Sequence, residues 1–384
     1  MATFNKTGGQ QQLKAAMQQS ELCTNCGACV DLCPYNVAFN DRIVFLDPCD
    51  RDEGRCYAFC PRTPTDLSAL YDGLFDAADL TPELGAVKGL YVTRAADPAI
   101  RDKAQHGGTV SALMALALKE GMIDSAVLAE DSGELEPRGT VVADADQVAS
   151  HAGSKFVVSP TVAAFNRLAK GEAQAIGVVA TPCQAMALAK MRLKPYAADA
   201  SHIDKLKLVV GLFCGWALSL QKLAGILEPH LKGSEILKLD IPPSGHACME
   251  VTTEQGMITI PLEEINPAIR PACSGCLDMT AEFADLSVGS ARLDGGWEES
   301  QGWNQVLVRT EAGQKLMDLA KDAGALEFRE APAGAMDKLK QASMNKKRRA
   351  LEHLAAQSGS EDDLIYLDPS DPLVIKLKQS WAAQ

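Results

Sequence analysis

The spacing of its cysteines constrains this chain most. Of twelve cysteines in 384 residues, seven lie within the first 60: Cys23, Cys26, Cys29, Cys33, Cys49, Cys56 and Cys60. The other five are Cys183, Cys214, Cys248, Cys273 and Cys276. In a small secreted protein such a cluster indicates disulfides, but this chain is long and we expect no secretory signal, because residues 1–20 are polar. The cysteines therefore predict metal binding.

The first four cysteines follow the spacing C-x2-C-x2-C-x3-C, and Pro34 comes directly after the last of them. This run matches the bacterial ferredoxin motif, in which three thiolates bind one iron–sulfur cluster and the fourth binds a second cluster. Zinc sites use paired cysteines, not three at this spacing. We therefore predict iron and inorganic sulfide, and expect Gly27 to let the backbone approach the cluster.

A bacterial ferredoxin repeats this motif, but the second copy is incomplete here. Cys56, Cys60 and Pro61 fit its end, Cys49 fits its first position, and no cysteine fits its second position. By ferredoxin logic, the first cluster takes Cys23, Cys26, Cys29 and Cys60. The second cluster then takes Cys33, Cys49 and Cys56.

The second cluster lacks a fourth thiolate. A carboxylate of Asp50, Asp52 or Glu53 could complete it, it could contain three irons, or it could be absent. We favour its presence.

From Lys88 onward the pattern becomes one of alternating strands and helices. Buried apolar strands that alternate with helices indicate an α/β layer with a largely parallel sheet. The expected strands are 89–93, 125–129, 175–180, 206–212, 249–253, 257–260, 286–288 and 306–309. The expected helices are 107–120, 160–170, 183–191 and 219–231.

The chain is therefore expected to combine an α+β, ferredoxin-like module with a larger mixed α/β body. The expected segments are a polar arm or short docking helix (1–20), the ferredoxin-like module (21–66), a linker (67–86), the body (87–332) and a C-terminal tail (333–384). The basic run Lys346–Arg349 in the tail could dock an acidic partner, although a solvated helix face is the simpler interpretation.

Charge and hydropathy exclude several classes of protein. With 37 basic and 50 acidic side chains the net charge is −13, so no general attraction to nucleic acid or anionic lipid is expected. The longest charge-free apolar stretches are shorter than the roughly 20 residues that a transmembrane helix needs. We expect a cytoplasmic protein without a transmembrane segment.

Four further stretches stand out. Gln105–Ser111 opens a predicted helix, Thr181–Gln184 joins a strand to a helix, Leu212–Cys214 ends a strand, and Arg270–Asp278 carries two cysteines. In this order they resemble the family of coenzyme F-420-reducing hydrogenase beta subunits. Relatives in that family include formate dehydrogenase beta subunits, F-420H2 oxidase subunits and 7-hydroxymethyl chlorophyll a reductase. The resemblance covers about residues 21–310.

The resemblance implies an FAD and a 4Fe-4S cluster in the body, hence two to three 4Fe-4S clusters in the chain. Two glycines at a helix start suit the FAD pyrophosphate, because exposed N–H groups and the helix dipole attract an anion. The implied cofactor-binding residues are Gly107, Gly108, Thr109, Ser111, Ser154, Lys155, Thr181 and Gln184.

Lys155 is the candidate catalytic residue, expected to face the flavin and stabilise its reduced, anionic ring. The alternative is a solvated surface lysine. His106 could reach the flavin or could be a structural histidine.

The natural ligands of the body's cluster are Cys183, Cys214, Cys273 and Cys276. Two of them follow predicted strands, where α/β folds build their sites, and the other two form a C-x2-C turn. Cys248 fits no motif and is expected to be a structural thiol.

The function implied by the resemblance is that of one component of an oxidoreductase complex. It would oxidise or reduce coenzyme F-420, or a similar hydride carrier, at the FAD and pass single electrons through the clusters to a partner. The partner would be a hydrogenase, formate dehydrogenase, heterodisulfide-reductase-like or sulfite-reducing module.

The hydride donor stays open. No G-x-G-x-x-G follows a strand, so a Rossmann-type nicotinamide site is not indicated. NAD(P)H or ferredoxin could still replace F-420. The chain could also be a pure electron-transfer subunit whose flavin meets only a partner protein.

Overall fold

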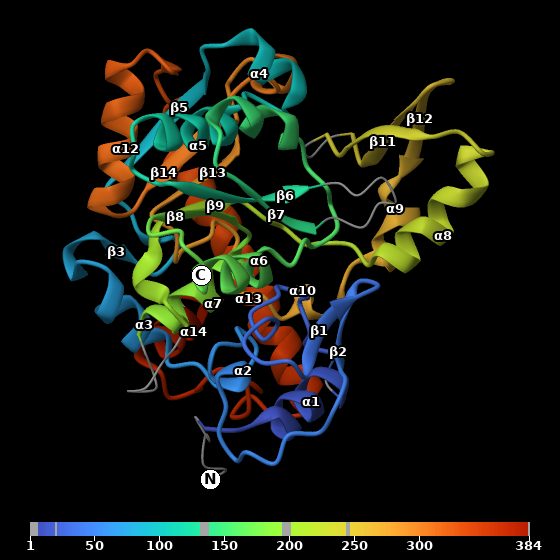
Figure 1. Ribbon diagram of the computed structural model, residues 1–384, viewed down its shortest axis with the longest axis vertical. Coiled ribbons are helices and arrows are strands. Elements are labelled where there is room, and N and C mark those ends of the chain that lie inside the picture. Colours follow the sequence, from blue (N-terminus) through green and yellow to red (C-terminus); the bar gives the residue numbers. More distant parts are fainter. Residues whose placement is uncertain (1–6, 20, 131–137, 194–200, 243–245, 383–384) are drawn as a thin grey trace.

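An eight-stranded mixed sheet forms the centre of the molecule (Figure 1). The computed structural model describes residues 7–19, 21–130, 138–193, 201–242 and 246–382. In sheet order the strands are β15 (Leu326–Arg329), β5 (Gly89–Ala95), β14 (Asn304–Val308), β13 (Leu286–Ser290), β9 (Leu206–Leu212), β8 (Ile176–Ala180), β6 (Ser125–Glu130) and β7 (Arg138–Val142).

Only the middle of this sheet is parallel. Strands β13, β9, β8 and β6 pair in parallel, whereas β15, β5, β14 and β7 join the sheet through antiparallel pairs. The expectation of a largely parallel sheet is therefore wrong at both flanks. The reason is clear at β7, because residues 131–137 are too few for the crossover that a parallel return needs.

Helices cover both faces of the sheet. Helices α5 (Thr109–Lys119) and α12 (Glu311–Asp322) share a core with Leu208 and Val210 of β9. Helices α6 (Thr161–Ala169) and α7 (Pro182–Arg192) pack on the other face, with Val209. This alternation follows from the two-residue period of a strand.

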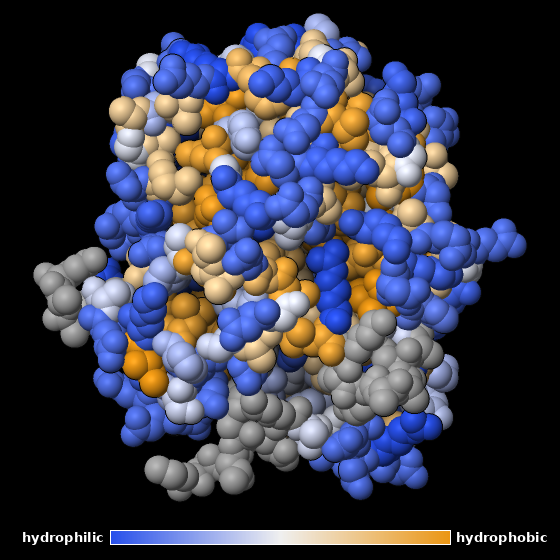
Figure 2. Space-filling view, turned by 90° about the vertical axis from the view of Figure 1, so that its left-hand side faces the viewer, coloured by the Kyte–Doolittle hydropathy of each residue, from blue (hydrophilic) through white to orange (hydrophobic). Residues whose placement is uncertain are grey.

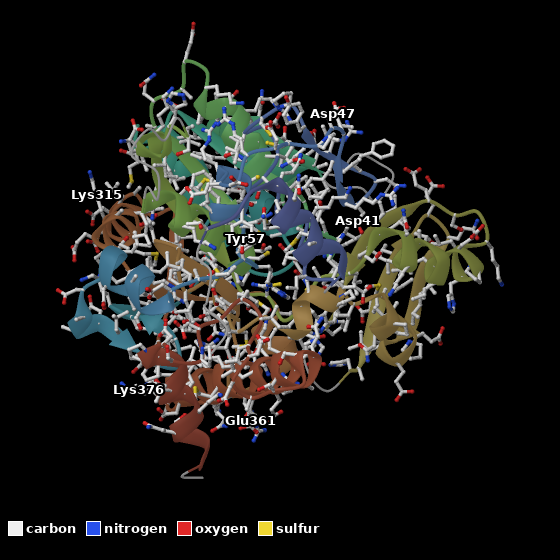
Figure 3. All side chains as sticks on the ribbon, turned by 90° about the horizontal axis from the view of Figure 1, so that it is seen from below. Asp41, Asp47, Tyr57, Lys315, Glu361 and Lys376 are labelled. Carbon is white, nitrogen blue, oxygen red and sulfur yellow. The ribbon has the colours of Figure 1, made fainter. Side chains whose placement is uncertain are left out.

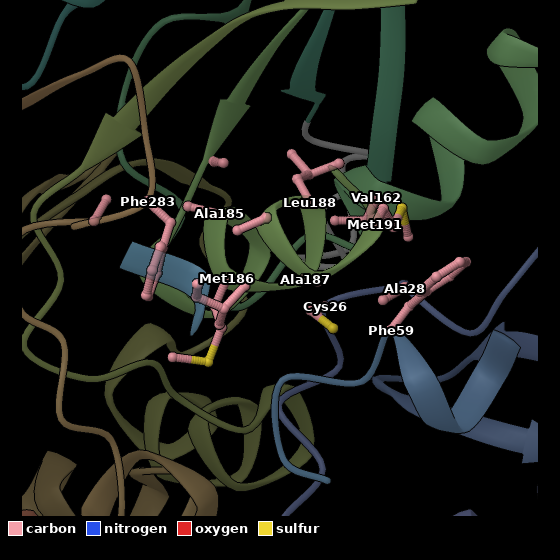
Figure 4. Packing of buried hydrophobic residues seen from close by; sticks show 14 of the residues in the cluster. Cys26, Ala28, Phe59, Val162, Ala185, Met186, Ala187, Leu188, Met191 and Phe283 are labelled. Atoms are coloured by element: carbon pink, nitrogen blue, oxygen red, sulfur yellow. The ribbon is translucent and has the colours of Figure 1, made fainter. Parts of the chain in front are cut away.

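The cysteine-rich module packs against α6 and α7. Figure 4 shows Cys26, Ala28 and Phe59 beside Val162 and Met191 in one buried cluster. The module contains α1 (Gln10–Gln19), β1 (Asn36–Phe39), β2 (Arg42–Phe45) and α2 (Arg55–Ala58). Helix α1 docks through Leu13, which is 1% exposed. Of the two alternatives for residues 1–20, a polar arm or a short docking helix, residues 10–19 therefore form the docking helix.

The expected linker is part of the packed structure. It contains α3 (Leu67–Leu74), the 3-10 helix η1 (Ala77–Asp79) and the short strands β3 (Leu80–Thr81) and β4 (Gly85–Ala86). Leu67, Leu70 and Tyr71 of α3 join the same core as α6 and α7. Residues 67–86 therefore pack against the body instead of forming a free linker.

A second sheet and its helices form a lobe on the right of Figure 1. Its strands are β10 (Ile236–Asp240), β11 (Cys248–Thr253) and β12 (Gly256–Pro261), packed with α8 (Leu220–Leu231) and α9 (Leu262–Ile265). The remaining short elements are α4 (Pro98–Lys103), η2 (Ala145–His151), η3 (Ile203–Lys205), η4 (Asn266–Ala268), α10 (Pro271–Ser274) and α11 (Trp297–Ser300).

The expected C-terminal tail belongs to the body. Residues 333–384 contain α13 (Ala335–Ser358) and α14 (Pro372–Ala382), and Leu351 and Leu354 of α13 lie in the main core. The interpretation of the basic run as a solvated face is wrong for Lys346 and Lys347, which are 8% and 2% exposed. Both charges are buried because acceptors from distant parts of the chain meet them.

The outer surface is mainly polar. Figure 2 shows one face, on which hydrophilic side chains surround smaller apolar areas. No helix in the described part of the chain is long and apolar enough to cross a membrane.

Candidate functional site

Four thiols of the cysteine-rich module line one cavity, which we call site 1. They are Cys23, Cys26, Cys29 and Cys60. Burial, together with repulsion from the neighbouring thiols, raises the pKa of Cys29 well above its usual value. Gly27 lies beside it at φ +85°, and an added Cβ would come within 2.7 Å of the Ala163 amide nitrogen, so glycine is required there.

A buried lysine supports site 1. Lys190 of α7 donates a hydrogen bond to the Cys60 carbonyl oxygen (2.7 Å) and to the hydroxyls of Thr63 and Thr65 (both 3.1 Å). Burial lowers its pKa to about 8. On the other side of the site, Arg270 near Cys23 forms an ion pair with Asp41.

Cys33, Cys49 and Cys56 form a second group, site 2. Burial raises the pKa of Cys56 to about 11, and the nearness of Cys33 and Cys49 contributes to this rise. Gln10 of α1 holds the loop that carries Cys49: its Oε1 accepts a hydrogen bond from the Cys49 N–H (2.8 Å), and its Nε2 donates to the Asp47 carbonyl (3.1 Å). No fourth cysteine joins this group within the described residues, and all twelve thiols there are unbridged.

Four cysteines of the body, Cys183, Cys214, Cys273 and Cys276, line a third cavity, site 3. Cys183 follows β8 at the start of α7, and Cys214 follows β9, so two ligand candidates lie at the carboxyl ends of parallel strands. Cys273 and Cys276 close the cavity from α10 and the turn after it. The backbone N–H of Ala217 donates to the Cys273 sulfur at 3.3 Å.

Two buried cations also line site 3. Lys346 donates to the carbonyl oxygens of Cys214 (2.8 Å) and Gly215 (2.9 Å), and the buried Arg62 lines the same cavity as Cys276. Burial raises the pKa of Cys276, but Lys346 and Arg62 outweigh burial, so the pKa lies below its usual value. Site 3 is therefore suited to thiolate and to added negative charge.

The three sites follow one another. Thr24 lines the cavities of both site 1 and site 3, and Cys26 and Cys183 face each other closely enough for mutual repulsion. Cys29 of site 1 likewise interacts with Cys56 of site 2. Site 1 thus lies between site 2 and site 3.

Sites 1 and 3 have the form of cluster sites. Each presents four thiols around a cavity, and in the parts of the chain described here no three Cys, His, Asp or Glu side chains meet closely enough for one metal ion. A zinc ion requires its four ligands at about 2.3 Å from one point. A larger group ligated at its corners fits these thiols better.

The segment predicted to bind FAD lies at the same edge of the sheet as site 3. Gly107 follows the end of β5, where its carbonyl accepts a hydrogen bond from Ala95, and α5 begins at Thr109. Gly108 has φ +75°, which only glycine adopts without strain. The Thr109 N–H donates to the side chain of Asn304 (3.2 Å), so protein already occupies this amide.

His106 is a polar side chain at this edge of the sheet. Its Nε2 lies 2.6 Å from the Ser290 hydroxyl at the end of β13, and its ring meets the edge of Trp297 at 5.6 Å. Its Nδ1 is buried without a hydrogen-bond partner in the described structure. An orphaned ring nitrogen of this kind fits a bound group that completes the site.

The other predicted flavin residues divide between two places. Ser154 contacts Gln105, so the 153–155 segment with Lys155 lies beside the start of α5, and Ser111 lies in the first turn of that helix. Thr181 instead lines site 3, 3.3 Å from the Cys183 sulfur.

Gln184 is 2% exposed and uses its amide to bind the Thr181 N–H and the Ser159 carbonyl. Both bonds hold Gln184 at the start of α7, next to Cys183.

A short series of contacts joins the two places. Ser290, the partner of His106, follows Gly289, and Phe213 packs directly against Gly289. Phe213 immediately precedes Cys214 of site 3. A group bound at His106 would therefore lie next to the thiol cavity.

Sequence reasoning missed Lys190, Arg62 and Lys346, the buried cations. Arg62 had a usable signal, because it follows the Cys60-Pro61 pair directly. Lys346 had none, since its partners Cys214 and Gly215 are more than a hundred residues away in sequence. Cys248 lies at the start of β11, apart from all three sites.

Comparisons with known proteins agree with this architecture. Residues 90–166 match the N-terminal part of the family described as the coenzyme F420 hydrogenase/dehydrogenase beta subunit, and residues 173–333 match the C terminus of the same family. Residues 19–38 match the 4Fe-4S binding domain.

Curated relatives align over most of their length. The chain is 31% identical to the beta subunit of the coenzyme F420 hydrogenase of Methanothermobacter thermautotrophicus over 280 residues, which cover 71% of this chain and 96% of the relative. It is 27% identical to the F subunit of the F(420)H(2) dehydrogenase of Methanosarcina mazei over 349 residues, which cover 88% and 93%.

A solved structure shares the fold. It is a chain of the xenon-derivatised F420-reducing NiFe hydrogenase complex from Methanosarcina barkeri, 28% identical, with a TM-score of 0.62 over 72% of this chain and 95% of that one. By these matches the chain belongs to the family of coenzyme F420 hydrogenase/dehydrogenase beta subunits.

Proposed function

We propose that the chain is the flavin- and cluster-bearing subunit of an oxidoreductase complex that exchanges a hydride with coenzyme F420 and single electrons with a redox partner. Its relatives include subunits of an F420 hydrogenase and of an F(420)H(2) dehydrogenase. One observation carries the proposal: three neighbouring sites lined by cysteine thiols lead from the N-terminal module to the sheet edge that holds His106.

The sheet edge is the proposed FAD site. When bound, the flavin supplies the exchange between a two-electron hydride and single electrons. The N-terminus of α5 attracts the charge of a pyrophosphate through the helix dipole, because the Thr109 N–H itself is already bound by Asn304. His106 offers its Nδ1 for a hydrogen bond to the flavin. Ser154 contacts Gln105, which places Ser154 and Lys155 at the same edge.

Lys155 is the proposed catalytic residue, because its ammonium would stabilise negative charge on the reduced flavin. Replacing Lys155 by Ala should slow flavin reduction while flavin content is kept, and Lys155→Arg should restore part of the rate. Equal rates of flavin reduction in the wild type and both variants would show that Lys155 does not have this role.

The cysteines are the proposed cluster ligands: four thiolates each at site 1 and site 3, and three at site 2. Lys190, Arg62 and Lys346 offset the negative charge that such groups bring into a buried place. Site 1, lying between the other two, would pass electrons in either direction.

The decisive experiment uses protein prepared without air. Iron, sulfide and flavin are counted first, and reduced F420, NADPH and reduced ferredoxin are then added separately while flavin absorbance is followed. Rapid bleaching by F420 alone supports the proposal. Bleaching by NADPH alone or by ferredoxin alone would mean that this donor, and not F420, is the substrate. A protein without flavin or iron would overturn the proposal as a whole.

A further inference from the structure

The β1–β2 hairpin is unusual because most of the side chains on its outer face are apolar as well as those on its inner face. Alternate residues Ala38, Ile43 and Phe45 face inward and pack with Leu13 and Cys29. The opposite face presents Tyr35, Val37, Phe39, Val44 and Leu46, together with one charged residue, the exposed Arg42 opposite Phe39. Of these, Tyr35 is 38% exposed, Phe39 65% and Leu46 57%.

Apolar side chains on the outer face of a hairpin need an explanation. An antiparallel sheet with one face in solvent normally presents polar side chains there. Phe39 and Leu46 are more than half exposed, and the hairpin lies at the periphery of the molecule (Figure 1). A contiguous exposed apolar surface marks a site of protein interaction.

The hairpin adjoins site 2 on both sides. Cys33 lies two positions before Tyr35, and Cys49 lies three positions after Leu46. Cys33, Cys49 and Cys56 are all half-buried, whereas at site 1 only Cys23 is half-buried and Cys26, Cys29 and Cys60 are buried. Site 2 is therefore the redox site nearest to solvent on the module, and the apolar face lies at its margin.

The loop between the hairpin and Cys56 gives this surface an acidic rim. It exposes Asp47, Asp50, Asp52 and Glu53 against a single basic residue, Arg51. Figure 3 shows Asp47 on the N-terminal module, near the hairpin. A partner that buries the apolar face would need basic side chains at its own rim to match these carboxylates.

We propose that the outer face of the β1–β2 hairpin, with the acidic loop 47–53, is the docking surface for a redox protein that presents an apolar patch ringed by Lys and Arg. The inference rests on the proposed function, because it assumes that site 2 holds iron. On docking, a single electron passes between site 2 and the redox centre of the partner. The donor is oxidised by one electron, the acceptor is reduced by one electron, and no bond forms or breaks.

The test compares two acceptors of the anaerobically reduced protein in a stopped-flow instrument. A basic c-type cytochrome, whose haem edge is surrounded by lysines, represents the partner, and uncharged benzoquinone reports electron release without docking. The variants are Phe39→Ser/Leu46→Ser, which removes apolar surface, and Asp47→Lys, which reverses a rim charge. Met257→Ser is the matched control, because Met257 is 64% exposed on β12, in the other lobe.

Both surface variants should lower the rate constant for the cytochrome at least fivefold and leave that for benzoquinone unchanged. Asp47→Lys should also weaken the dependence of the cytochrome rate on salt. Equal cytochrome rates in wild type and variants, or an equal loss in Met257→Ser, would overturn the docking surface. Loss of iron or of benzoquinone reduction in the wild type would instead count against the proposed function.

Discussion

The Arg62 guanidinium helps to lower the pKa of the Cys276 thiol at site 3, although Arg62 is only two residues from Cys60 at site 1. Its guanidinium also lies 5.0 Å from the centre of the Tyr366 ring, and the side chain is 3% exposed. Arg62 therefore connects site 1 with site 3 and brings a permanent positive charge to site 3.

Replacing Arg62 by Gln should lower the reduction potential of the cluster at site 3, because a nearby cation stabilises the more negative, reduced state. The expected effect is about 1.4 kcal/mol, which corresponds to about 59 mV for a one-electron couple. Potentiometric titration followed by EPR measures it. Arg62→Lys, which keeps the charge, should shift the potential less, and Arg348→Gln on the exposed face of α13 should not shift it.

Replacing Cys273 by Ala should remove the iron and sulfide of one cluster while the clusters of the N-terminal module remain. Cys273 is one of four thiols around site 3, and a cubane without one corner ligand is labile. Cys248→Ala is the control, since Cys248 lies on β11 apart from the cavities. Iron counts and EPR spectra of the three proteins decide the matter; unchanged iron in Cys273→Ala would exclude Cys273 as a ligand.

The cysteine group of site 1 was largely predictable because the ferredoxin motif encodes it in short spacings, whereas the group of site 3 depended on strand ends and on the family resemblance. The central strands were predictable for a related reason, since runs such as 206–212 are largely apolar and must be buried on both faces. Strand β7 was missed because most of its residues are exposed or only partly buried, as an edge strand permits.

The burial of α13 could not be predicted from local pattern. A run of four basic residues indicates a solvated face, and it becomes buried here only because Glu282 and the carbonyls of Cys214 and Gly215 meet two of the charges. The role of Gln10 was hidden in the same way. Its partners Asn36, Asp47 and Cys49 come together only when the module has folded.

Replacing Lys347 by Met should destabilise the protein by about 3–5 kcal/mol, because it leaves a buried carboxylate without its partner. The Lys347 ammonium lies 2.5 Å from Glu282, and the two side chains are 3% and 1% exposed. Glu282 also accepts a hydrogen bond from Tyr71 of α3, so the pair joins α13 to the body.

Urea unfolding of the anaerobic protein measures this loss. Arg348→Met is the matched control on the same helix: its ion pair with Glu352 spans 3.9 Å on the surface and should contribute less than about 1 kcal/mol. The double variant Lys347→Met/Glu282→Gln should recover part of the stability, because no buried charge then remains unpaired. A double variant no more stable than Lys347→Met would show that the charge of Glu282 is not the cause.

Replacing Gln10 by Ala should empty site 2 and leave sites 1 and 3 filled. The Gln10 amide binds the Asn36 side chain (3.0 Å), the Asp47 carbonyl and the Cys49 N–H, so it fixes the loop that positions the Cys49 thiol. Its loss leaves these groups unsatisfied at a cost of about 1–3 kcal/mol, concentrated in this loop. Iron per chain and the EPR spectrum of the reduced protein would report the loss of one cluster. Lys14→Ala, on the exposed side of the same helix, should keep the full iron content, and the same content in Gln10→Ala would mean that Cys49 needs no support from α1.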